Sequence, residues 1–413
     1  MHILFLTHYF PPEVNAPASR TWENVRLWKA MGHRVTVVTC APNHPNGIVY
    51  PGYRNRWFQR ETIEGIDIIR VGILLSANKG MIRRTLSFIS YMIAVILNAW
   101  RIPSADIVVS TSPQFFCGLA GAFFQRRRPW VLEIRDLWPE SVVAVGAAKH
   151  SPITRFFEAI EHWAYHRADR IVALSPAFVG HIQRWRPKGA TVDVIENGVD
   201  LAFYDVEAAK HAGRRLRAEL GLGERFIAAY IGTHGMAHGL TALLDAAELL
   251  RGRLDIVILM VGDGAERDSL AKAVAQRDLG NVIMTGQRPK SDMPGMWQIS
   301  DASLVLLRRS EAFEAVLPSK MFEAMALCRP IVLGVEGEAK SLLARSGAGV
   351  AVAPEDAEAI AEAIRMLADD PAGARRMGEK GRLFVEIHHD RRRLAEKYVA
   401  ILEQAVADHR AGR

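Results

Sequence analysis

The 413-residue sequence has few cysteines and no pattern typical of a metal site. Cys40, Cys117 and Cys328 are an odd number of thiols, lie far apart, and form neither a CxxC motif nor a Cys/His ligand set. The 14 histidines include no HExxH motif, and no Asp-x-Asp pair is present to hold a divalent ion between phosphates. We therefore expect reduced thiols in a cytosolic protein, and a site that works without a metal or a cofactor.

The sequence also lacks a signal peptide and a long apolar segment. The stretch Met1–Tyr9 has no basic n-region and only a four-residue apolar core, so we expect a first strand there. The apolar run Leu86–Trp100 covers 15 residues and includes Ser87, Ser90 and Asn98. Such a run is short for a span across about 30 Å of hydrocarbon. These features predict a cytoplasmic protein.

Negative charge is scarce in the first half of the chain. Residues 1–195 contain 23 Lys and Arg against 13 Asp and Glu, whereas the remainder has a small excess of acidic residues. A basic half indicates an anionic partner. The sequence has no zinc-finger, RNP or basic-zipper pattern, so nucleic acid is not expected and a membrane surface is favoured.

Residues 79–101 give the membrane interpretation a specific segment. Cations flank its apolar run on both sides, at Lys79, Arg83, Arg84 and Arg101. Tyr91 and Trp100 lie within the run, and an interfacial helix with basic flanks fits this pattern better than a spanning helix. The alternative is a buried amphipathic helix of the N-terminal domain. We expect peripheral contact with the inner face of the cell membrane through this segment.

Strand and helix patterns alternate along the whole chain, which predicts parallel α/β layers. In the first half, strand-like runs occur at 2–7, 34–39, 66–71, 106–110, 130–135, 170–174 and 192–195. A strong turn signal follows at Asn197-Gly198. The pattern then begins again, with strand-like runs near 226–231, 255–261, 281–285, 303–307 and 330–333. Two successive doubly wound domains are predicted, with their boundary at this turn.

The segment 316–326, Val-Leu-Pro-Ser-Lys-Met-Phe-Glu-Ala-Met-Ala, places a cation and a carboxylate three residues apart at the start of a predicted helix. The helix is expected to begin near Pro318 or Ser319, because proline suits the first helical position and serine suits an N-cap. Free N–H groups there attract phosphate, and Lys320 adds a positive charge. Glu323 comes one residue too late for a capping box, so it can accept ligand hydroxyls. The alternative is an ordinary solvated helix start.

Two glycine-containing loops follow predicted strands of the same half. They are Gly232-Thr233-His234-Gly235 and Gly262-Asp263-Gly264. Ligands of doubly wound domains bind at the carboxyl ends of strands, where backbone N–H groups can cradle a phosphate. Either loop alone is a weak signal, because turns use glycine in any case. Together with residues 318–323 they predict a nucleotide diphosphate ligand.

The strand ends of the N-terminal half carry a different set of residues. No GxGxxG motif follows the first strand, which argues against a dinucleotide cofactor. A helix is expected to begin near Ala18 or Ser19, and its first turn could face an anion with the help of Arg20. The alternative for Arg20 is a surface cation.

The strand at 130–135 ends in Asp136, a carboxylate where substrate would lie. Trp138 could offer a flat surface to a sugar ring or pack the loop. Glu133 and Arg135 alternate with apolar residues, which favours burial of one of them in an ion pair.

Several of these motifs together resemble family 4 of the retaining GT-B glycosyltransferases. They are Asn197-Gly198-Val199-Asp200 with Phe203, Gly262-Asp263-Gly264, Gly286, and Pro318-Ser319-Lys320 through Glu323-Ala324. Two further motifs are similar to the subgroup that builds O-antigen and capsule, such as the N-acetyl-L-fucosaminyl transferases: Tyr9-Phe10-Pro11-Pro12 and Asp136-Leu137-Trp138-Pro139-Glu140-Ser141. The resemblance covers nearly the whole chain.

The resemblance implies an α/β protein of GT-B fold, with two Rossmann-like domains facing a central cleft. The N-terminal domain, 1–196, would bind the acceptor and be joined by a C-terminal helix near 388–413. The second domain, 197–387, would bind the nucleotide-sugar donor, for which we expect a UDP-sugar. The acceptor implied is a polyprenyl-diphosphate-linked saccharide at the cytoplasmic membrane face. Glu323 is expected on the ribose hydroxyls, and Ser319 and Lys320 beside the diphosphate.

The sequence departs from the family pattern at several positions. The family's paired glutamates are eight apart, but Ala315 stands eight residues before Glu323. The usual Arg and Lys after the first strand of the second domain are absent, and Thr233, His234 and His238 stand in that loop. We expect Lys320, with Arg288, to substitute for the missing cations. The double glycine of the N-terminal loop is also missing, and Val14-Asn15-Ala16 stands there.

The expected site residues fall into a catalytic set and a donor-binding set. The expected catalytic residues are Asp136, Lys320 and Glu323, with Asp136 where many members carry a histidine near the donor sugar. The expected donor-binding residues are Asn15, Arg20, Gly232, Thr233, His234, His238, Gly262, Gly264, Arg288, Leu317, Pro318, Ser319, Lys320 and Glu323.

The expected reaction is transfer of a sugar, N-acetylated or deoxy, from a nucleotide diphosphate to an acceptor hydroxyl in surface polysaccharide synthesis. Retention by front-face attack is favoured, because no free carboxylate nucleophile is evident, and charge stabilisation at the leaving phosphate should supply most of the rate. The alternatives are a sugar-nucleotide epimerase of similar architecture and a catalytically silent scaffold of a polysaccharide assembly complex.

Overall fold

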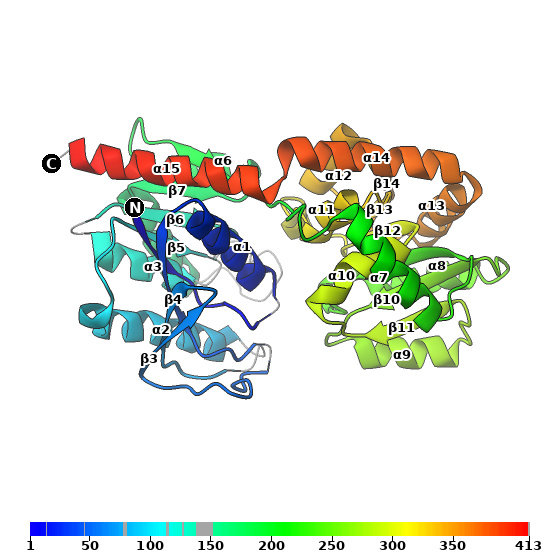
Figure 1. Cartoon of the computed structure of the whole chain (residues 1–413), viewed down its shortest axis with the longest axis horizontal. Coiled ribbons are helices and arrows are strands. Elements are labelled where there is room, and N and C mark those ends of the chain that lie inside the picture. Colours follow the sequence, from blue (N-terminus) through cyan, green and yellow to red (C-terminus); the bar gives the residue numbers. More distant parts are fainter. Residues whose placement is uncertain are drawn as a thin grey trace. The chain divides into compact units, whose positions relative to one another are not determined.

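The computed structural model describes residues 1–13, 15–44, 46–76, 81–112, 115–125, 128–137 and 152–411. It divides into two compact units (Figure 1). Unit 1 consists of Met1–Asn197 and the chain from Arg391, and unit 2 consists of Gly198–Asp390. The chain therefore passes from unit 1 to unit 2 at the Asn197-Gly198 turn and returns after Asp390.

Unit 1 is built on an eight-stranded sheet with the order β3-β4-β2-β1-β5-β6-β7-β8. Its strands are β1 (His2–Leu6), β2 (Arg34–Cys40), β3 (Phe58–Ile63), β4 (Ile66–Val71), β5 (Ile107–Thr111), β6 (Trp130–Ile134), β7 (Arg170–Ala173) and β8 (Val192–Val194). Its helices are α1 (Ala16–Ala30), α2 (Met81–Leu97), η1 (Ala99–Arg101), α3 (Phe115–Phe124), α5 (Pro152–Arg167), α6 (Ala177–Gln183) and α15 (Arg391–Ala411). All strand pairs are parallel except β3 with β4.

The edge strand β3 has no counterpart in the sequence prediction. It forms a hairpin with β4 in which Ile63 pairs with Ile66, leaving a two-residue turn. Both turn residues, Glu64 and Gly65, have positive φ, at 48° and 73°. Two positive φ values suit a hairpin turn whose twist matches its strands, and Asn-Gly is the usual sequence for it. Glu-Gly is a weaker signal, which explains why the sequence did not reveal this strand.

Helices cover both faces of the unit 1 sheet. On one face α1 packs against α15 (Figure 1). There the rings of Trp28 and Tyr398 meet edge to face, with 5.2 Å between their centres. The crossover through α1 runs from β1 to β2, whereas the crossovers through α2, α3 and α5 run in the opposite direction along the sheet, from β4 towards β7. Right-handed connections place these helices on the other face. The C-terminal helix thus completes the core of unit 1.

Unit 2 is built on a six-stranded parallel sheet with the order β11-β10-β9-β12-β13-β14. Its strands are β9 (Phe226–Ile231), β10 (Ile256–Val261), β11 (Val282–Gly286), β12 (Ala302–Leu306), β13 (Ile331–Gly334) and β14 (Gly349–Ala351). Its helices are α7 (Val206–Glu219), η3 (Met236–His238), α8 (Leu240–Leu249), α9 (Arg267–Gln276), η4 (Lys290–Asp292), α10 (Met293–Ile299), η5 (Glu311–Phe313), α11 (Ser319–Ala326), α12 (Glu338–Ser346), α13 (Ala357–Asp369) and α14 (Pro371–His388).

Two apolar cores pack against opposite faces of the unit 2 sheet. Side chains of one strand alternate between them, as Ala228 and Tyr230 belong to one core and Ile227 and Ala229 to the other. This alternation is the signature of a strand buried on both faces. The prediction of two doubly wound α/β domains is confirmed by the strand orders and pairings.

The segment 79–101 is largely described, and residues 81–101 form α2 followed by η1. Among the helices that the structure describes, none is long and apolar enough to cross a membrane.

Candidate functional site

The sheet of unit 2 has a topological switch point between β9 and β12. From β9 the strand order proceeds through β10 and β11 towards one edge, and from β12 through β13 and β14 towards the other. Ligands of doubly wound folds bind outside the carboxyl ends of the strands at such a point. The loop after β9 and the segment from β12 to α11 both start from this point, and they hold most of the predicted donor-binding residues.

Glycines allow the loops after β9 and β10 to lie directly against each other. A Cβ atom on Gly262, whose φ is +143°, would overlap the carbonyl oxygen of Gly232, and one on Gly264 would overlap that of His234. Hydrogen bonds of 2.9 Å join Gly232 N to Val261 O and His234 N to Asp263 O. Gly262 and Gly264 are therefore required by backbone packing, whatever else the loops do.

Lys320 points from α11 into the loop after β9. A Cβ atom on Gly232 would lie 2.7 Å from Lys320 Nζ, and Nζ lies 4.0 Å from the centre of the Tyr230 ring. The ammonium is buried and has no hydrogen-bond partner within the described residues. Burial lowers the pKa of Lys320 to about 7, although the nearby Glu323 carboxylate acts to raise it. A desolvated cation without a hydrogen bond is costly, so this position suits an incoming anion.

Two histidines and a tyrosine surround Lys320. His234 is fully buried, and neither ring nitrogen has a hydrogen-bond partner in the described part of the chain. The Tyr230 ring lies 5.9 Å from the rings of both His234 and His238, and its hydroxyl donates to Thr233 O at 2.7 Å. Burial and the charge of Lys320 lower the pKa of His238 to about 4, and burial also lowers that of His234. Both imidazoles are therefore neutral near pH 7.

Helix α11 begins at Ser319, with Pro318 at the N-cap, and Leu317 before it is buried. The Glu323 carboxylate does not cap this helix. Its Oε2 atom accepts a hydrogen bond of 3.1 Å from Trp297 Nε1. The expectation that Glu323 is not used in capping agrees with this contact, and Trp297 is a partner that the sequence did not reveal. We call Tyr230, Gly232, His234, His238, Lys320 and Glu323 the donor cluster.

Arg288, predicted to help bind phosphate, has a different contact in the structure. Its Nη1 atom lies 2.9 Å from Glu219 Oε1 at the end of α7. This ion pair gives Arg288 a role within unit 2, and its phosphate contact stays a prediction.

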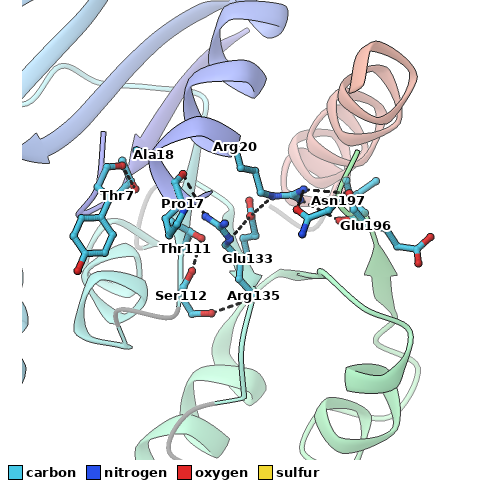
Figure 2. Close-up of polar contacts among 12 residues, drawn as sticks. Thr7, Pro17, Ala18, Arg20, Thr111, Ser112, Glu133, Arg135, Glu196 and Asn197 are labelled. Atoms are coloured by element: carbon cyan, nitrogen blue, oxygen red, sulfur yellow. Dashed lines mark hydrogen bonds and ion pairs between the residues drawn. The ribbon is translucent and has the colours of Figure 1, made fainter. Parts of the chain in front are cut away.

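Unit 1 has its own switch point, between β1 and β5. Glu133 lies on β6, beside β5, and Arg20 and Arg135 approach its carboxylate from two sides (Figure 2). Arg20 Nε lies 3.0 Å and Arg135 Nε 3.8 Å from Glu133 Oε1, and all three side chains are at least nine-tenths buried. Burial alone would raise the pKa of Glu133, but the two guanidinium groups outweigh it and lower the pKa. The expectation that one of Glu133 and Arg135 is buried in an ion pair is confirmed, and in the structure both are.

Most of the hydrogen-bonding capacity of Arg20 is directed into unit 1. Its terminal nitrogens donate to the carbonyl oxygen of Ile195 at 3.0 Å and to that of Glu196 at 3.1 Å (Figure 2). Asn15 is the N-cap of α1, because its Oδ1 atom accepts from Ala18 N at 2.9 Å. These contacts explain both residues as structural, and their contact with a donor stays a prediction.

Asp136 lines a small, mostly apolar hollow together with Phe115, Leu132 and Tyr165. Trp138 and the rest of its motif lie outside the described residues. Glu161 also lines this hollow, and with His162 and His181 it forms a group whose ligand atoms lie within 4.8 Å of one another, as a metal ion would require. The HExxH and Asp-x-Asp motifs do not reveal this group, because Glu161 and His162 lie on α5 whereas His181 lies on α6.

Models of known protein families match both units. The model of a glycosyl transferase 4-like domain matches residues 15–198, and that of glycosyl transferases group 1 matches residues 214–384. A putative colanic acid biosynthesis glycosyl transferase, WcaI, of Escherichia coli K12 is 26% identical over 383 residues, which cover 88% of this chain and 91% of WcaI. The O-antigen chain mannosyltransferase C of Escherichia coli is 28% identical over 57% of this chain and 60% of its own.

Solved structures share the whole fold at low identity. Sucrose-phosphate synthase of Thermosynechococcus elongatus superposes with a TM-score of 0.76 at 19% identity, covering 98% of this chain and 99% of that one. HepE of Anabaena, solved with UDP and glucose, gives a TM-score of 0.70 at 17% identity, covering 97% and 99%. WaaG, described as a glycosyltransferase involved in lipopolysaccharide biosynthesis, gives the same values.

Proposed function

The chain belongs to the family 4 glycosyltransferases of GT-B fold, and from this premise we propose that it is a retaining enzyme of surface polysaccharide synthesis. It transfers a sugar from a nucleotide diphosphate to a hydroxyl of a polyprenyl-diphosphate-linked saccharide. The names of WcaI, the O-antigen mannosyltransferase and WaaG support the polysaccharide assignment. The N-acetylated or deoxy nature of the sugar, and the likeness to fucosaminyl transferases, rest on the sequence motifs alone.

The buried ammonium of Lys320 carries the proposal for the donor. Its Nζ atom lies at the switch point of unit 2 and has no hydrogen-bond partner among the residues described there. A diphosphate at this position would receive the ammonium, the free N–H groups of the first turn of α11 and the hydroxyl of Ser319. The HepE complexes with UDP and UDP-glucose support a uridine nucleotide as the donor.

The remaining residues of the donor cluster have separate roles. Glu323, oriented by Trp297, accepts hydrogen bonds from the ribose hydroxyls. His234 and His238 are neutral, so they donate or accept hydrogen bonds but add no charge. Lys320 therefore supplies the positive charge that stabilises the leaving phosphate, a role that other enzymes give to a metal ion. Within this proposal, the leaving phosphate takes the proton of the acceptor hydroxyl during front-face attack.

Asp136, Asn15 and Arg20 of unit 1 complete the proposed assignments. We propose that Asp136 contacts the transferred sugar and that Asn15 and Arg20 contribute to the binding of the donor phosphates. The acceptor lies at the inner face of the cell membrane, with residues 79–101 in contact with its surface.

Thermal denaturation with a panel of UDP-, GDP- and dTDP-sugars tests the donor assignment. A ligand at 100 times its Kd stabilises the folded state by about 2.7 kcal/mol, which raises the melting temperature measurably. Lys320→Ala and Glu323→Ala should lose this shift and all sugar transfer while the fold stays intact. Lys340→Ala is the matched control, because Lys340 is half exposed and pairs only with Glu336 in the described structure. A full shift in Lys320→Ala, or no shift of the wild type with any sugar nucleotide, contradicts the assignment.

A further inference from the structure

Glu161 on α5 is a buried carboxylate whose charge is only partly balanced. It is 4% exposed, and no lysine or arginine of the described residues pairs with it. Its Oε1 atom accepts a hydrogen bond of 2.5 Å from the hydroxyl of Tyr165 on the same helix. Its Oε2 atom faces His181 Nε2 on α6 at 3.9 Å, which is too long for a hydrogen bond. Buried charges in proteins are paired or coordinate a metal ion, so a cation should balance Glu161.

Two imidazoles lie beside this carboxylate. The ligand atoms of Glu161, His162 and His181 all lie within 4.8 Å of one another. The ring of His162 stacks on that of Trp185, with 3.5 Å between their centres and 11° between their planes. The ring of His181 meets that of Tyr165 edge to face, with 6.3 Å between their centres. Aromatic neighbours thus hold both imidazoles next to the carboxylate.

The spacing of these three groups is close to that of a zinc site. Zinc binds imidazole nitrogen and carboxylate oxygen at about 2.0–2.2 Å, so tetrahedral ligands are about 3.4 Å apart. The 3.9 Å between His181 Nε2 and Glu161 Oε2 exceeds this value by about half an ångström, and the limit of 4.8 Å exceeds it by about 1.4 Å. Small side-chain rotations close such differences. A shared ion therefore fits this geometry better than direct hydrogen bonds between the three groups.

The chemistry of the ligands indicates which ion. Two imidazoles and one carboxylate match the ligand set of zinc sites that keep one position for water. Mg²⁺ and Ca²⁺ prefer oxygen ligands, so two nitrogen donors select against them. The side chain of His181 is 23% exposed, which gives the ion and its water a path from solvent. The hydrogen bond from Tyr165 to Glu161 is of the kind that orients a metal ligand.

We propose that Glu161, His162 and His181 bind one zinc ion, which links α5 to α6 and has water at its fourth position. The ion balances the buried carboxylate and joins the helix before β7 to the helix after it. Because the ligands meet only when both helices are in place, zinc should bind the folded state and stabilise unit 1. Its role is structural, and it takes no part in the proposed sugar transfer, for which Lys320 of unit 2 supplies the charge.

Zinc binding by the full-length protein, after removal of metals with EDTA, tests this proposal. Equilibrium dialysis should give one Zn²⁺ per chain, and the melting temperature should rise with Zn²⁺ but not with Mg²⁺. Co²⁺ in place of Zn²⁺ should give the visible absorption of a four-coordinate site with nitrogen ligands. The wild type alone therefore provides three independent readouts, none of which depends on enzyme activity.

Four variants identify the ligands. His162→Phe keeps an aromatic ring against Trp185 but removes the ligand atom, and His181→Ala removes the ligand of the second helix. Each should weaken Zn²⁺ binding by more than about a hundredfold, because even an outer partner of a metal ligand contributes about 10–100-fold. Tyr165→Phe removes the hydrogen bond to the carboxylate and should weaken binding by about tenfold. His211→Ala is the matched control, because His211 is an exposed histidine on α7 of unit 2.

Three results would overturn the proposal: absence of zinc uptake by the metal-free wild type, zinc uptake that His162→Phe and His181→Ala leave unchanged, or equal losses in these variants and His211→Ala. The first result would leave an ion pair between Glu161 and a protonated His181 as the charge balance. The other two would assign the bound zinc to other groups of the protein. The melting-temperature shift with UDP-sugars should be the same in His162→Phe and the wild type, so this test is separate from that of the proposed function.

Discussion

Replacing Lys320 with methionine is expected to stabilise unit 2 and to abolish nucleotide binding at the same time. The wild-type ammonium is buried over the Tyr230 ring and has no hydrogen-bond partner within the described residues. Methionine keeps the apolar part of the side chain and removes the charge. The buried charge destabilises the free protein but is required for nucleotide binding, so its removal should raise the stability and abolish the binding.

The pKa of Lys320 gives the size of the effect and its dependence on pH. Each pKa unit corresponds to about 1.36 kcal/mol, so the fall from 10.5 to about 7 corresponds to about 5 kcal/mol of destabilisation. This destabilisation is fully present below pH 7, where the lysine is charged in both states. It disappears as the pH rises from 7 to 10.5, because the folded state then binds fewer protons than the unfolded state. Because relaxation of the surrounding protein reduces this value, we expect Lys320→Met to be about 1–4 kcal/mol more stable than the wild type at pH 6.

Nucleotide binding should reverse the pKa shift. A diphosphate next to the ammonium favours its charged form, so binding at pH 8 takes up about one proton. The apparent Kd for UDP should therefore rise by up to about tenfold per pH unit between pH 7 and pH 9. The terminal phosphate of UDP titrates mainly below this range, because its second pKa is about 6.

Two measurements test this reasoning. Titration calorimetry with UDP at pH 8, in two buffers of different ionisation enthalpy, gives the number of protons taken up. Urea unfolding at pH 6 and pH 9 gives the stability difference between Lys320→Met and the wild type, which should be larger at pH 6. A Kd that is constant between pH 7 and pH 9 without proton uptake would refute the reasoning, and so would a variant less stable than the wild type.

Two further substitutions at structurally required positions are each compared with a control substitution that should have little effect. Arg20→Ala should destabilise the protein by about 3–5 kcal/mol, because it leaves the buried Glu133 carboxylate with fewer cations, whereas Arg34→Ala removes an exposed pair and should cost less than about 1 kcal/mol. Urea unfolding compares them, and equal losses would contradict the buried network. Gly262→Ala should lower the melting temperature and remove UDP binding, because its Cβ would overlap a backbone carbonyl; Gly252→Ala has open space and should behave as wild type in both assays.

The features that the sequence predicted are those set by local pattern. The run at 226–231 is a continuous apolar segment and that at 34–39 is rich in β-branched residues; both have the length of a buried strand, and they form β9 and β2. Pro318 and Ser319 predicted where α11 begins, because proline and serine have strong positional preferences at a helix start. Such signals need no knowledge of the partner elements, so a single sequence can provide them.

The contacts that were not predicted depend on residues far apart in the chain. Trp297 is 26 positions from Glu323, and Tyr398 is 265 positions from Glu133, to which its hydroxyl donates at 3.1 Å. No spacing rule connects such pairs. Arg20 matches both a surface cation and an anion ligand in sequence, and only the fold reveals that it is buried against Glu133. The ionisation of Lys320 likewise follows from burial, which its sequence neighbours do not determine.

The departures of the donor loop from the family pattern and the low pKa of Lys320 have a common explanation. Where arginine and lysine would stand after β9, this chain has His234 and His238, which are neutral because burial, with the charge of Lys320, lowers their pKa values. A second permanent cation at this loop would repel the ammonium of Lys320 within the same desolvated space. Neutral imidazoles do not repel that ammonium, so Lys320 can stay charged there and bind the phosphate. Replacing His238 with lysine should therefore weaken UDP binding at pH 7 by lowering the charged fraction of Lys320, and a tighter Kd in that variant would contradict this explanation.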